Sequence, residues 1–395
     1  SSQSLVLMKI AFISGVFFPI PGGAQVQIHN IANKLFKLGC DVKLLIYNKT
    51  NIKNNNYNII LLNKFLLNIF FFFKYYLNLN LFFFLNFYIS YLIKKYNFDI
   101  WHFSFLNFKS LILINVLKKL DSKAKIIVTF HGADVQIDRS INYGFRLNKK
   151  YDDLLKSTLD KIDKYTYISK TIKKDLIDLG IKEEKLIYFP NGVNLSKFEQ
   201  NIYEKRNRDG IFNLITVARF AEKKKGFDLI HQIALGLKEK KINFKWKIIG
   251  QNSKLLLKNQ FFKLNADLFD LIDNIENVDE EYFPHTDLIK HYKNSDLYVN
   301  LSRIESFGIT YIESLAAGVP ILSFMSKGSN EIIKDNFNGF FIYQNNISDF
   351  VEKIYQLNKS KNNLIDFKKN CFESVKKFDL DLTSNKLLIT YKKLI

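Results

Sequence analysis

Residues Tyr298–Pro320 read YVNLSRIESFGITYIESLAAGVP, and this stretch decides the fold expected for the chain. A strand-like apolar run at 297–301 leads into a short loop that ends at Gly308. A helix is predicted over 309–317, and Gly318 follows it as glycine often follows a helix. Strand, glycine-containing loop and helix start together predict an anion site, because the free backbone N–H groups of a helix start point outward.

Two carboxylates flank this predicted anion site. Glu305 lies in the loop and Glu313 in the helix, in the pattern Glu-x7-Glu. A carboxylate would repel a phosphate that bound alone. It suits a ligand that carries hydroxyl groups beside its phosphates, as a nucleotide sugar does.

Length and charge set the frame for the rest of the chain. The 395 residues suggest two domains, and 47% hydrophobic residues are ample for their cores. The net charge of +20 indicates an anionic partner, such as nucleic acid, a membrane surface or a phosphorylated ligand. The basic excess is larger in residues 1–200, with 28 Lys and Arg against 14 Asp and Glu. A compositional bias toward Lys, Asn, Ile, Phe and Tyr is the alternative explanation.

The cysteines and the start of the chain indicate the compartment. Cys40 and Cys371 are the only cysteines, which disfavours a disulfide framework or a cysteine metal site and fits a reducing compartment. No signal peptide is visible, and Ser1–Leu7 look like an extension ahead of Met8. We expect a cytoplasmic protein that is peripheral at the inner face of the membrane.

Strand and helix patterns alternate in two successive blocks. The first block has predicted strands at 8–14, 42–47, 99–104, 125–130, 165–169 and 185–189, with helices at 24–38, 106–120, 151–161 and 170–179. The second has predicted strands at 212–218, 244–249, 297–301, 321–324 and 339–343, with helices at 227–238, 285–294 and 309–317 and an irregular stretch from 250 to Pro284. This rhythm predicts two doubly wound α/β domains with mostly parallel sheets.

The domain boundary is expected in the polar segment 195–211. We therefore predict an N-terminal domain over 1–200 and a C-terminal domain over 201–380. A final helix at 381–395 is expected to pack back on the N-terminal domain.

Residues 64–95, KFLLNIFFFFKYYLNLNLFFFLNFYISYLIKK, are long enough for two helices and unusually aromatic. Polar residues interrupt the segment, so no run of 18 apolar residues suggests a spanning helix. Buried core helices and an interfacial membrane element both remain open, because aromatics flanked by lysines suit the headgroup boundary. A transmembrane hairpin is the third alternative.

Six motifs in sequence carry a resemblance to a known family. They are PGGAQVQIHNIANKL, VTFHGAD, YISKTIKKDL, FPNGVNLSKF, ITVARFAEKKKGFDLI and ESFGITYIESLAAGVPIL, and they extend over nearly the whole chain. The chain resembles the retaining nucleotide-sugar glycosyltransferases of family four. The resemblance implies the GT-B architecture, in which two Rossmann-like domains face each other across a cleft.

The resemblance implies a donor site in the second domain. Arg219 and Lys225 are similar to the family's Arg/Lys phosphate pair, although one extra residue in the spacing leaves Lys224 as a rival. Glu313 resembles the carboxylate that binds ribose hydroxyls, and Glu305 the one that contacts the donor sugar. The backbone N–H groups of residues 306–308 (Ser306, Phe307 and Gly308) would bind the diphosphate. Base recognition is expected near Tyr282–His285, which leaves UDP and GDP both open.

The first domain contributes further candidates. His131 resembles the family histidine near the donor sugar, and Asp134 is a candidate for contact with the acceptor or the sugar. Gly22 and Gly23 would let the backbone approach a phosphate. For each of these residues the structural alternative is an ordinary strand end or turn.

The implied reaction is a retaining sugar transfer by front-side attack, assisted by the departing phosphate. No cofactor is expected, and metal-independent chemistry is predicted, because the family pattern lacks the metal-binding Asp-x-Asp of the other transferase fold and the sequence shows no clustered His, Cys and carboxylate ligands. The predicted partners are a UDP- or GDP-sugar donor and a saccharide or lipid-linked acceptor used in cell-surface polysaccharide or glycoconjugate synthesis. An anionic membrane surface is a further possible partner, and nucleic acid is not expected.

Three other functions fit parts of the pattern. A glycoside hydrolase would use Glu305 and Glu313 as its carboxylate pair. A nucleotide-sugar epimerase would need no acceptor, and a non-catalytic subunit would bind the nucleotide sugar only. The cations at Arg219 and Lys225 favour a phosphate-containing donor over hydrolysis.

Overall fold

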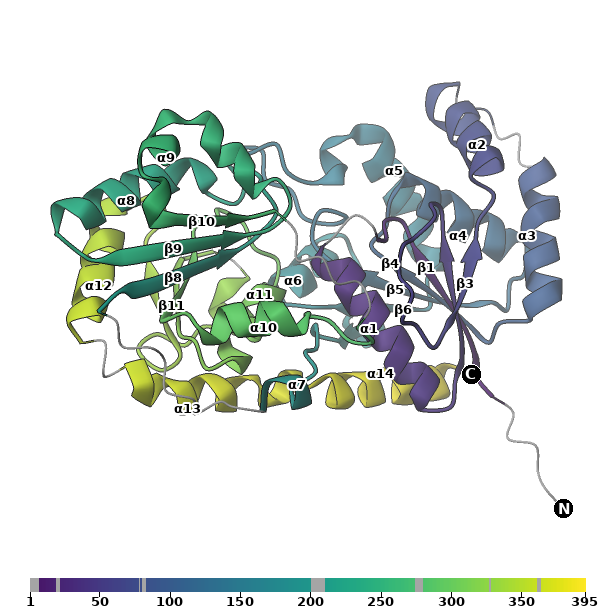
Figure 1. The fold of residues 1–395 in the computed structure, drawn as a ribbon. Helices are drawn as coiled ribbons and strands as arrows, with labels where there is room; N and C mark the ends of the chain where they lie inside the picture. Colours follow the sequence, from purple (N-terminus) through teal and green to yellow (C-terminus); the bar gives the residue numbers. More distant parts are fainter. Residues whose placement is uncertain are drawn as a thin grey trace, which may run out of the picture. The chain divides into compact units, whose positions relative to one another are not determined.

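The computed structural model describes residues 7–18, 22–77, 79, 83–199, 210–273, 280–326, 328–360 and 364–395. The chain forms two compact units (Figure 1): unit 1 comprises Ser1–Asn191 with Leu380–Ile395, and unit 2 comprises Gly192–Asp379. The division at 191/192 precedes the segment 195–211 in which it was expected. The backbone N–H of Val193 donates to the carbonyl of Phe378 at 2.9 Å, which ties this segment to unit 2. Residues 200–209 of the expected linker lie outside the described residues.

The sheet of unit 1 is parallel throughout its described strands. Its order is β3-β2-β1-β4-β5-β6-β7, formed by β1 (Lys9–Ser14), β2 (Asp41–Ile46), β3 (Asn58–Leu61), β4 (Ile100–Ser104), β5 (Lys125–Phe130), β6 (Lys164–Tyr167) and β7 (Leu186–Tyr188). In register, Ser14 pairs with Ser104 and Ser104 with Thr129, so the carboxyl ends of the central strands align. In α/β sheets this edge is where ligands bind.

Helices follow most of these strands. They are α1 (Gly23–Lys37), α2 (Lys64–Tyr76), α3 (Phe83–Tyr96), α4 (Phe108–Leu120), α5 (Lys149–Thr158) and α6 (Lys170–Asp178). The last helix of the chain, α14 (Leu380–Leu394), also belongs to unit 1 and packs on α1, where Lys34 Nζ lies 2.5 Å from Asp381 Oδ1. Its Tyr391 is fully buried, and its hydroxyl lies 2.5 Å from His102 Nδ1 on β4.

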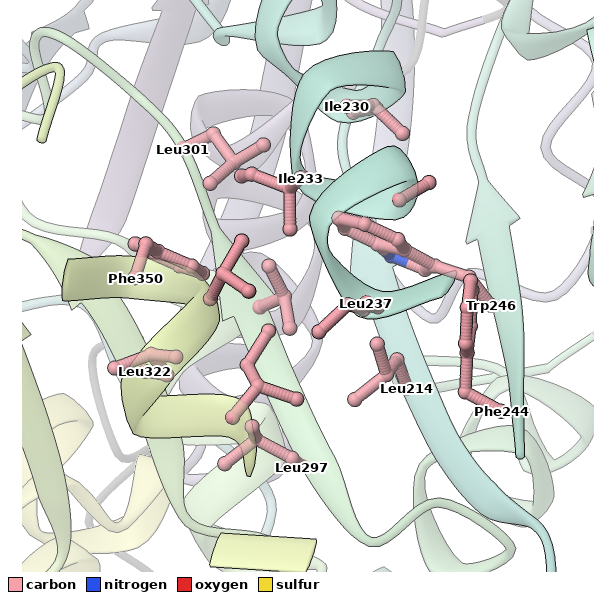
Figure 2. Packing of buried hydrophobic residues seen from close by; sticks show 14 of the residues in the cluster. Leu214, Ile230, Ile233, Leu237, Phe244, Trp246, Leu297, Leu301, Leu322 and Phe350 are labelled. Atoms are coloured by element: carbon pink, nitrogen blue, oxygen red, sulfur yellow. The ribbon is translucent and has the colours of Figure 1, made fainter. Parts of the chain in front are cut away.

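Unit 2 has the same architecture. Its described parallel sheet has the order β10-β9-β8-β11-β12-β13, formed by β8 (Phe212–Val217), β9 (Phe244–Ile249), β10 (Phe269–Ile272), β11 (Leu297–Asn300), β12 (Ile321–Phe324) and β13 (Gly339–Ile342). The helices are α7 (Ser196–Glu199), α8 (Ile230–Glu239), α9 (Gln260–Leu264), α10 (Thr286–Lys293), α11 (Ile309–Ala316), α12 (Ile347–Lys359) and α13 (Leu364–Val375). Leu214, Trp246, Leu297 and Phe350 meet in the core between this sheet and its helices (Figure 2).

The fold confirms the prediction of two Rossmann-like parallel-sheet domains, with two local corrections. The stretch from 250 to Pro284 is not irregular throughout, because α9 and β10 lie within it. β3, which follows an Asn-rich stretch of the sequence, was not predicted. Both strands are four residues long and lie at a sheet edge, where half-exposed side chains weaken the apolar signal.

Candidate active site

A loop from Ala218 to Gly226 follows β8 and carries the predicted phosphate-binding cations. Gly226 has φ +69°, and a Cβ at this position would lie 2.1 Å from the carbonyl oxygen of Leu301. Only glycine therefore allows this loop to lie against the segment that follows β11. The close approach brings Lys225 to Glu305, and the Lys225 Nζ lies 2.7 Å from the Glu305 Oε2.

The rival lysine lies in the same electrostatic neighbourhood. The pKa of Lys224 is lowered to about 8, chiefly by burial and also by the charges of Lys225 and Arg219, while Glu305 opposes the shift. Arg219 is exposed, whereas Lys224 and Lys225 are half-buried. The structure thus brings Lys224 and Lys225 close to Glu305 and Arg219 close to Lys224, and both lysines remain candidates for phosphate binding.

Arg303 joins the two loops, a role that was not predicted from the sequence. Its guanidinium forms two hydrogen bonds to the carboxylate of Asp228, each 2.8 Å long, and a third of 2.6 Å to the carbonyl of Lys223. Its backbone N–H donates to the carbonyl of Lys224 at 3.0 Å. A paired-donor contact of this kind fixes orientation as well as distance, so Arg303 positions the cation loop.

The loop after β11 ends at Gly308, directly before α11. Gly308 has φ +89°, and a Cβ there would lie 2.4 Å from the ring of Tyr311. Glycine is therefore required at this helix start. The first-turn N–H groups of a helix lack intrahelical acceptors, so residues 306–308 and the start of α11 stay the candidates for the anion site that the sequence predicts.

Glu313 lies behind this helix start, with 4% of its surface exposed. The hydroxyl of Tyr292 on α10 donates to the Glu313 Oε2 at 3.0 Å. Burial raises the pKa of Glu313 from 4.5 to about 8, although Tyr292 and Lys197 oppose the shift. Glu305 contacts a lysine and Glu313 a tyrosine, so the two acids of the Glu-x7-Glu pattern have different environments.

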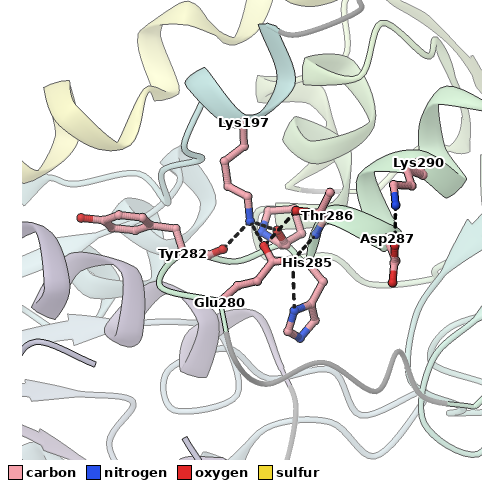
Figure 3. A network of polar contacts seen from close by, with 8 residues as sticks. Lys197, Glu280, Tyr282, His285, Thr286, Asp287 and Lys290 are labelled. Atoms are coloured by element: carbon pink, nitrogen blue, oxygen red, sulfur yellow. Dashed lines mark hydrogen bonds and ion pairs between the residues drawn. The ribbon is translucent and has the colours of Figure 1, made fainter. Parts of the chain in front are cut away.

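The segment predicted to read the base is held by Lys197 (Figure 3). The Lys197 ammonium pairs with Glu280 and donates to the carbonyls of Tyr282 at 2.6 Å and Pro284 at 2.7 Å. Glu280 Oε1 in turn accepts from the backbone N–H of Thr286 at 2.8 Å, the first residue of α10. Lys197 and Glu280 were not predicted, and they determine the shape of this loop through contacts to its backbone.

In unit 1, His131 lies at the carboxyl edge of the sheet, directly after β5. Its Nε2 lies 2.8 Å from the hydroxyl of Ser104, the last residue of β4. Burial lowers the pKa of His131 to about 4, so the imidazole is neutral at pH 7. A neutral imidazole can exchange hydrogen bonds with sugar hydroxyls.

Asp134 has a different environment from the one expected of an acceptor contact. It is fully buried, and its carboxylate accepts from the backbone N–H groups of Gly132 at 2.9 Å, His131 at 3.1 Å and Leu106 at 3.2 Å. Burial raises its pKa to about 7. In this conformation the carboxylate shapes the loop that carries His131, and a contact of Asp134 with the acceptor or the sugar stays a prediction.

Gly22 and Gly23 lie at the start of α1, also at the carboxyl edge. Gly22 has φ 174°, an extended backbone that any residue adopts, and a Cβ there would meet only the movable end of the Gln25 side chain. Backbone geometry therefore does not require glycine at position 22. Residues 19–21 of the predicted loop lie outside the described residues.

Two family models divide the chain between them. The model of glycosyltransferase family 4 matches residues 21–197, and that of the group 1 glycosyl transferases matches residues 197–374. Each match falls mainly within one of the two Rossmann-like units. The chain is a GT-B glycosyltransferase.

This glycosyltransferase is similar over its length to other members. It is 25% identical to an uncharacterized glycosyltransferase of Methanocaldococcus jannaschii, with 98% of each chain covered. It is 26% identical to the alpha-monoglucosyldiacylglycerol synthase of Streptococcus pneumoniae, over 85% of this chain and 75% of that protein. The Anabaena protein HepE, solved with UDP and glucose, has the same fold, with a TM-score of 0.74 at 13% identity, covering 98% of this chain and 100% of HepE.

Within the parts of the chain that the structure describes, no cluster of three or more His, Cys, Asp or Glu side chains could hold a metal ion. Among the helices of the described ranges, none has both the length and the apolar character needed to cross a bilayer.

Proposed function

We propose that this glycosyltransferase transfers a sugar, with retention of anomeric configuration, from a nucleoside-diphosphate sugar to a saccharide or lipid-linked acceptor. The observation that carries the proposal is the ion pair between Lys225 and Glu305, with Lys224 close enough to both, and to Arg219, to feel their charges. This arrangement offers cations for a diphosphate and a carboxylate for a sugar hydroxyl within one unit.

The cations meet the main electrostatic demand of the reaction. Cleaving the sugar–phosphate bond leaves negative charge on the phosphate oxygens, so fixed positive groups there stabilise the transition state. Arg219 and the lysine pair supply that charge, and the N–H groups of residues 306–308 add donors. Arg303 keeps the loop in place, so little reorganisation is needed when the charge develops.

Glu305 changes partner when the donor binds. Without donor its carboxylate accepts from Lys225. We propose that the bound diphosphate also pairs with the Lys225 ammonium and so weakens its pair with Glu305. The Glu305 carboxylate then accepts a hydrogen bond from a hydroxyl of the transferred sugar. The ion pair thus keeps both side chains in place before the donor arrives.

Glu313 is proposed to accept hydrogen bonds from the ribose hydroxyls. Such donors stabilise a carboxylate, and they would therefore lower the pKa that burial raises. Donor binding near pH 7 is then accompanied by release of a proton from Glu313.

Retention without a covalent intermediate requires the acceptor hydroxyl to attack from the side on which the phosphate departs. The departing phosphate then accepts the proton of the attacking hydroxyl, and no protein base is needed. His131 is proposed to hydrogen bond a hydroxyl of the transferred sugar. The reaction is proposed to be metal-independent, since the cations take the role that a bound metal would have.

The relatives support particular partners. HepE binds UDP and glucose, which favours UDP over GDP, and the pneumococcal relative is named for a glucosylated diacylglycerol, which favours a lipid acceptor. We propose a UDP-hexose donor and an acceptor at the cytoplasmic face of the membrane, in glycoconjugate or cell-surface polysaccharide synthesis.

A ligand panel tests the proposal. UDP- and GDP-sugars are compared by thermal shift, and we expect a rise of several degrees with one nucleotide series. The sugar that binds is then incubated with lipid and saccharide acceptors, and the anomeric configuration of the product is read by NMR. Product with inverted configuration, or release of free sugar alone, would contradict the retaining transfer.

A further inference from the structure

The helices α2 and α3 carry exposed aromatic side chains on their outer sides. In α2 these are Phe65, Phe72 and Tyr76, seven and four residues apart, while Leu67 and Phe70 are buried on the opposite face. In α3 they are Phe83, Phe87 and Tyr91, four residues apart, opposite Leu85, Ile89 and Leu92. We call these six exposed residues the aromatic face. A helix that only covers a core does not expose a second apolar stripe of this kind.

The surroundings of the aromatic face are positively charged. From Val42 to Phe98 the chain has seven lysines and no acidic residue. Lys64 begins α2, and Lys94 and Lys95 end α3, all three exposed. Beside Phe83, a cavity of about 830 Å³ is lined by further lysines, Lys74, Lys118, Lys119 and Lys161. Aromatic side chains with lysines at their margin match the interface of an anionic bilayer.

One flank of α2, between its exposed and its buried face, contacts the segments that follow the carboxyl ends of the strands. Lys64 Nζ donates to Asn48, after β2, at 2.9 Å, and Lys109 Nζ, in α4, donates to Asn68 of α2 at 2.5 Å. Near the end of α2, Tyr75 accepts from Asn148 at 2.7 Å. α2 therefore lies along the edge of unit 1 that carries His131, with α3 packed beside it (Figure 1).

We propose that the aromatic face docks on the surface of an anionic phospholipid bilayer. The aromatic rings enter the headgroup boundary, and the lysines pair with lipid phosphates. Docking places the carboxyl edge of unit 1 beside the bilayer, where the headgroup of a lipid-linked acceptor is presented. This last step rests on the proposed function, whereas the docking itself does not.

Vesicle flotation of the full chain tests the docking. We expect recovery with vesicles that contain phosphatidylglycerol, weaker recovery with pure phosphatidylcholine, and a decrease as salt rises. F83S/F87S should lower the bound-to-free ratio by at least ~tenfold, because two exposed rings no longer enter the bilayer. K94E/K95E should lower it by about tenfold or more on anionic vesicles and change little on neutral ones.

A matched control separates docking from general surface hydrophobicity. Leu264 and Tyr343 in unit 2 are 73% and 74% exposed, close to the 77% and 78% of Phe87 and Phe83. L264S/Y343S should float like the wild type, and all three double variants should keep the wild-type melting temperature. Equal flotation of F83S/F87S and wild type, or no flotation of the wild type, would overturn the proposal.

Two further outcomes are informative. If light scattering shows a dimer without lipid, and F83S/F87S makes it monomeric, a second copy covers the aromatic face and bilayer docking is wrong. Donor-induced thermal shift is measured on the same variants. Lost flotation with an intact shift in F83S/F87S supports docking, whereas a wild type that floats but shows no shift with any nucleotide sugar contradicts only the proposed function.

Discussion

Lys225 Nζ lies 2.7 Å from Glu305 Oε2, although the two residues are 80 positions apart in the chain. The contact joins the loop after β8 to the loop after β11, at the carboxyl ends of two paired strands. It places a lysine side by side with the acid that we propose to bind a sugar hydroxyl. Several outcomes of mutation depend on this pair.

K225A should weaken binding of the donor by about 10- to 100-fold, since a charge-assisted hydrogen bond contributes ~1.5–3 kcal/mol. Calorimetric titration with the nucleotide sugar measures the effect. K224A is the matched comparison in the same loop. If K224A costs more affinity than K225A, Lys224 is the phosphate-binding lysine and the assignment of Lys225 is wrong.

R219A should lose most of the donor-induced thermal shift while the melting temperature without donor stays unchanged. Arg219 is exposed, so its removal leaves no buried group without a partner. K223A is the control, because Lys223 is also exposed and lies in the same loop. A full donor-induced shift in R219A would exclude Arg219 from the donor site.

R303K should reduce the affinity for the donor although Arg303 is not proposed to touch it. Lysine cannot reproduce the two parallel hydrogen bonds to Asp228, so the cation loop becomes less ordered. We expect a loss of about 1–2 kcal/mol in the free energy of unfolding, measured in urea. K290A removes the exposed pair with Asp287 and should cost less than about 0.5 kcal/mol. Equal effects of R303K and K290A would show that Arg303 does not position the loop.

The pH dependence of stability should report Glu313. Because burial raises its pKa from 4.5 to about 8, the folded chain holds this proton more tightly than the unfolded chain. The contribution of Glu313 to the free energy of unfolding is therefore full below pH 4.5 and is lost as the pH rises through about 8. E313Q, which stays neutral, should show a smaller decrease over this range in urea titrations.

Asp134 has a pKa raised to about 7 and changes stability in the same direction, so only the difference between wild type and E313Q reports Glu313. Parallel curves for the two proteins would mean that Glu313 is ionised in the folded chain at neutral pH. Y292F should raise the pKa of Glu313 further, since it removes the hydroxyl that donates to the carboxylate.

Removal of divalent metal should leave the transfer rate unchanged. Arg219, Lys224 and Lys225 are proposed to neutralise the departing diphosphate themselves. Initial rates are compared after treatment with EDTA and after addition of Mg²⁺ or Mn²⁺. A rate that collapses with EDTA and returns with one metal would contradict the metal-independent mechanism.

The strand, loop and helix of residues 298–320 were predictable because their sequence signals are local. The apolar run before the loop predicts β11, and Gly308 followed by apolar helical spacing predicts α11, both of which the structure confirms. The short edge strands β3 and β10 were missed, because a strand paired on one side has a weaker apolar pattern.

Residues 64–95 were also only partly predictable from the sequence. Their two helices were predictable, but not which aromatic side chains are buried and which exposed.

The amino-acid sequence by itself determined the two α/β blocks, the anion-binding helix start and the identity of the cations and acids near it. Only the tertiary structure decided which of them meet. The approach of Gly226 to Leu301 brings Lys225 to Glu305. The packing of α10 on α11 places the Tyr292 hydroxyl within hydrogen-bonding distance of Glu313. The buried carboxylate of Asp134 accepts from the backbone of the loop that carries His131. The physical reason is that periodicity and turn chemistry act over a few residues, whereas hydrogen bonds and burial depend on neighbours that folding brings from distant parts of the chain.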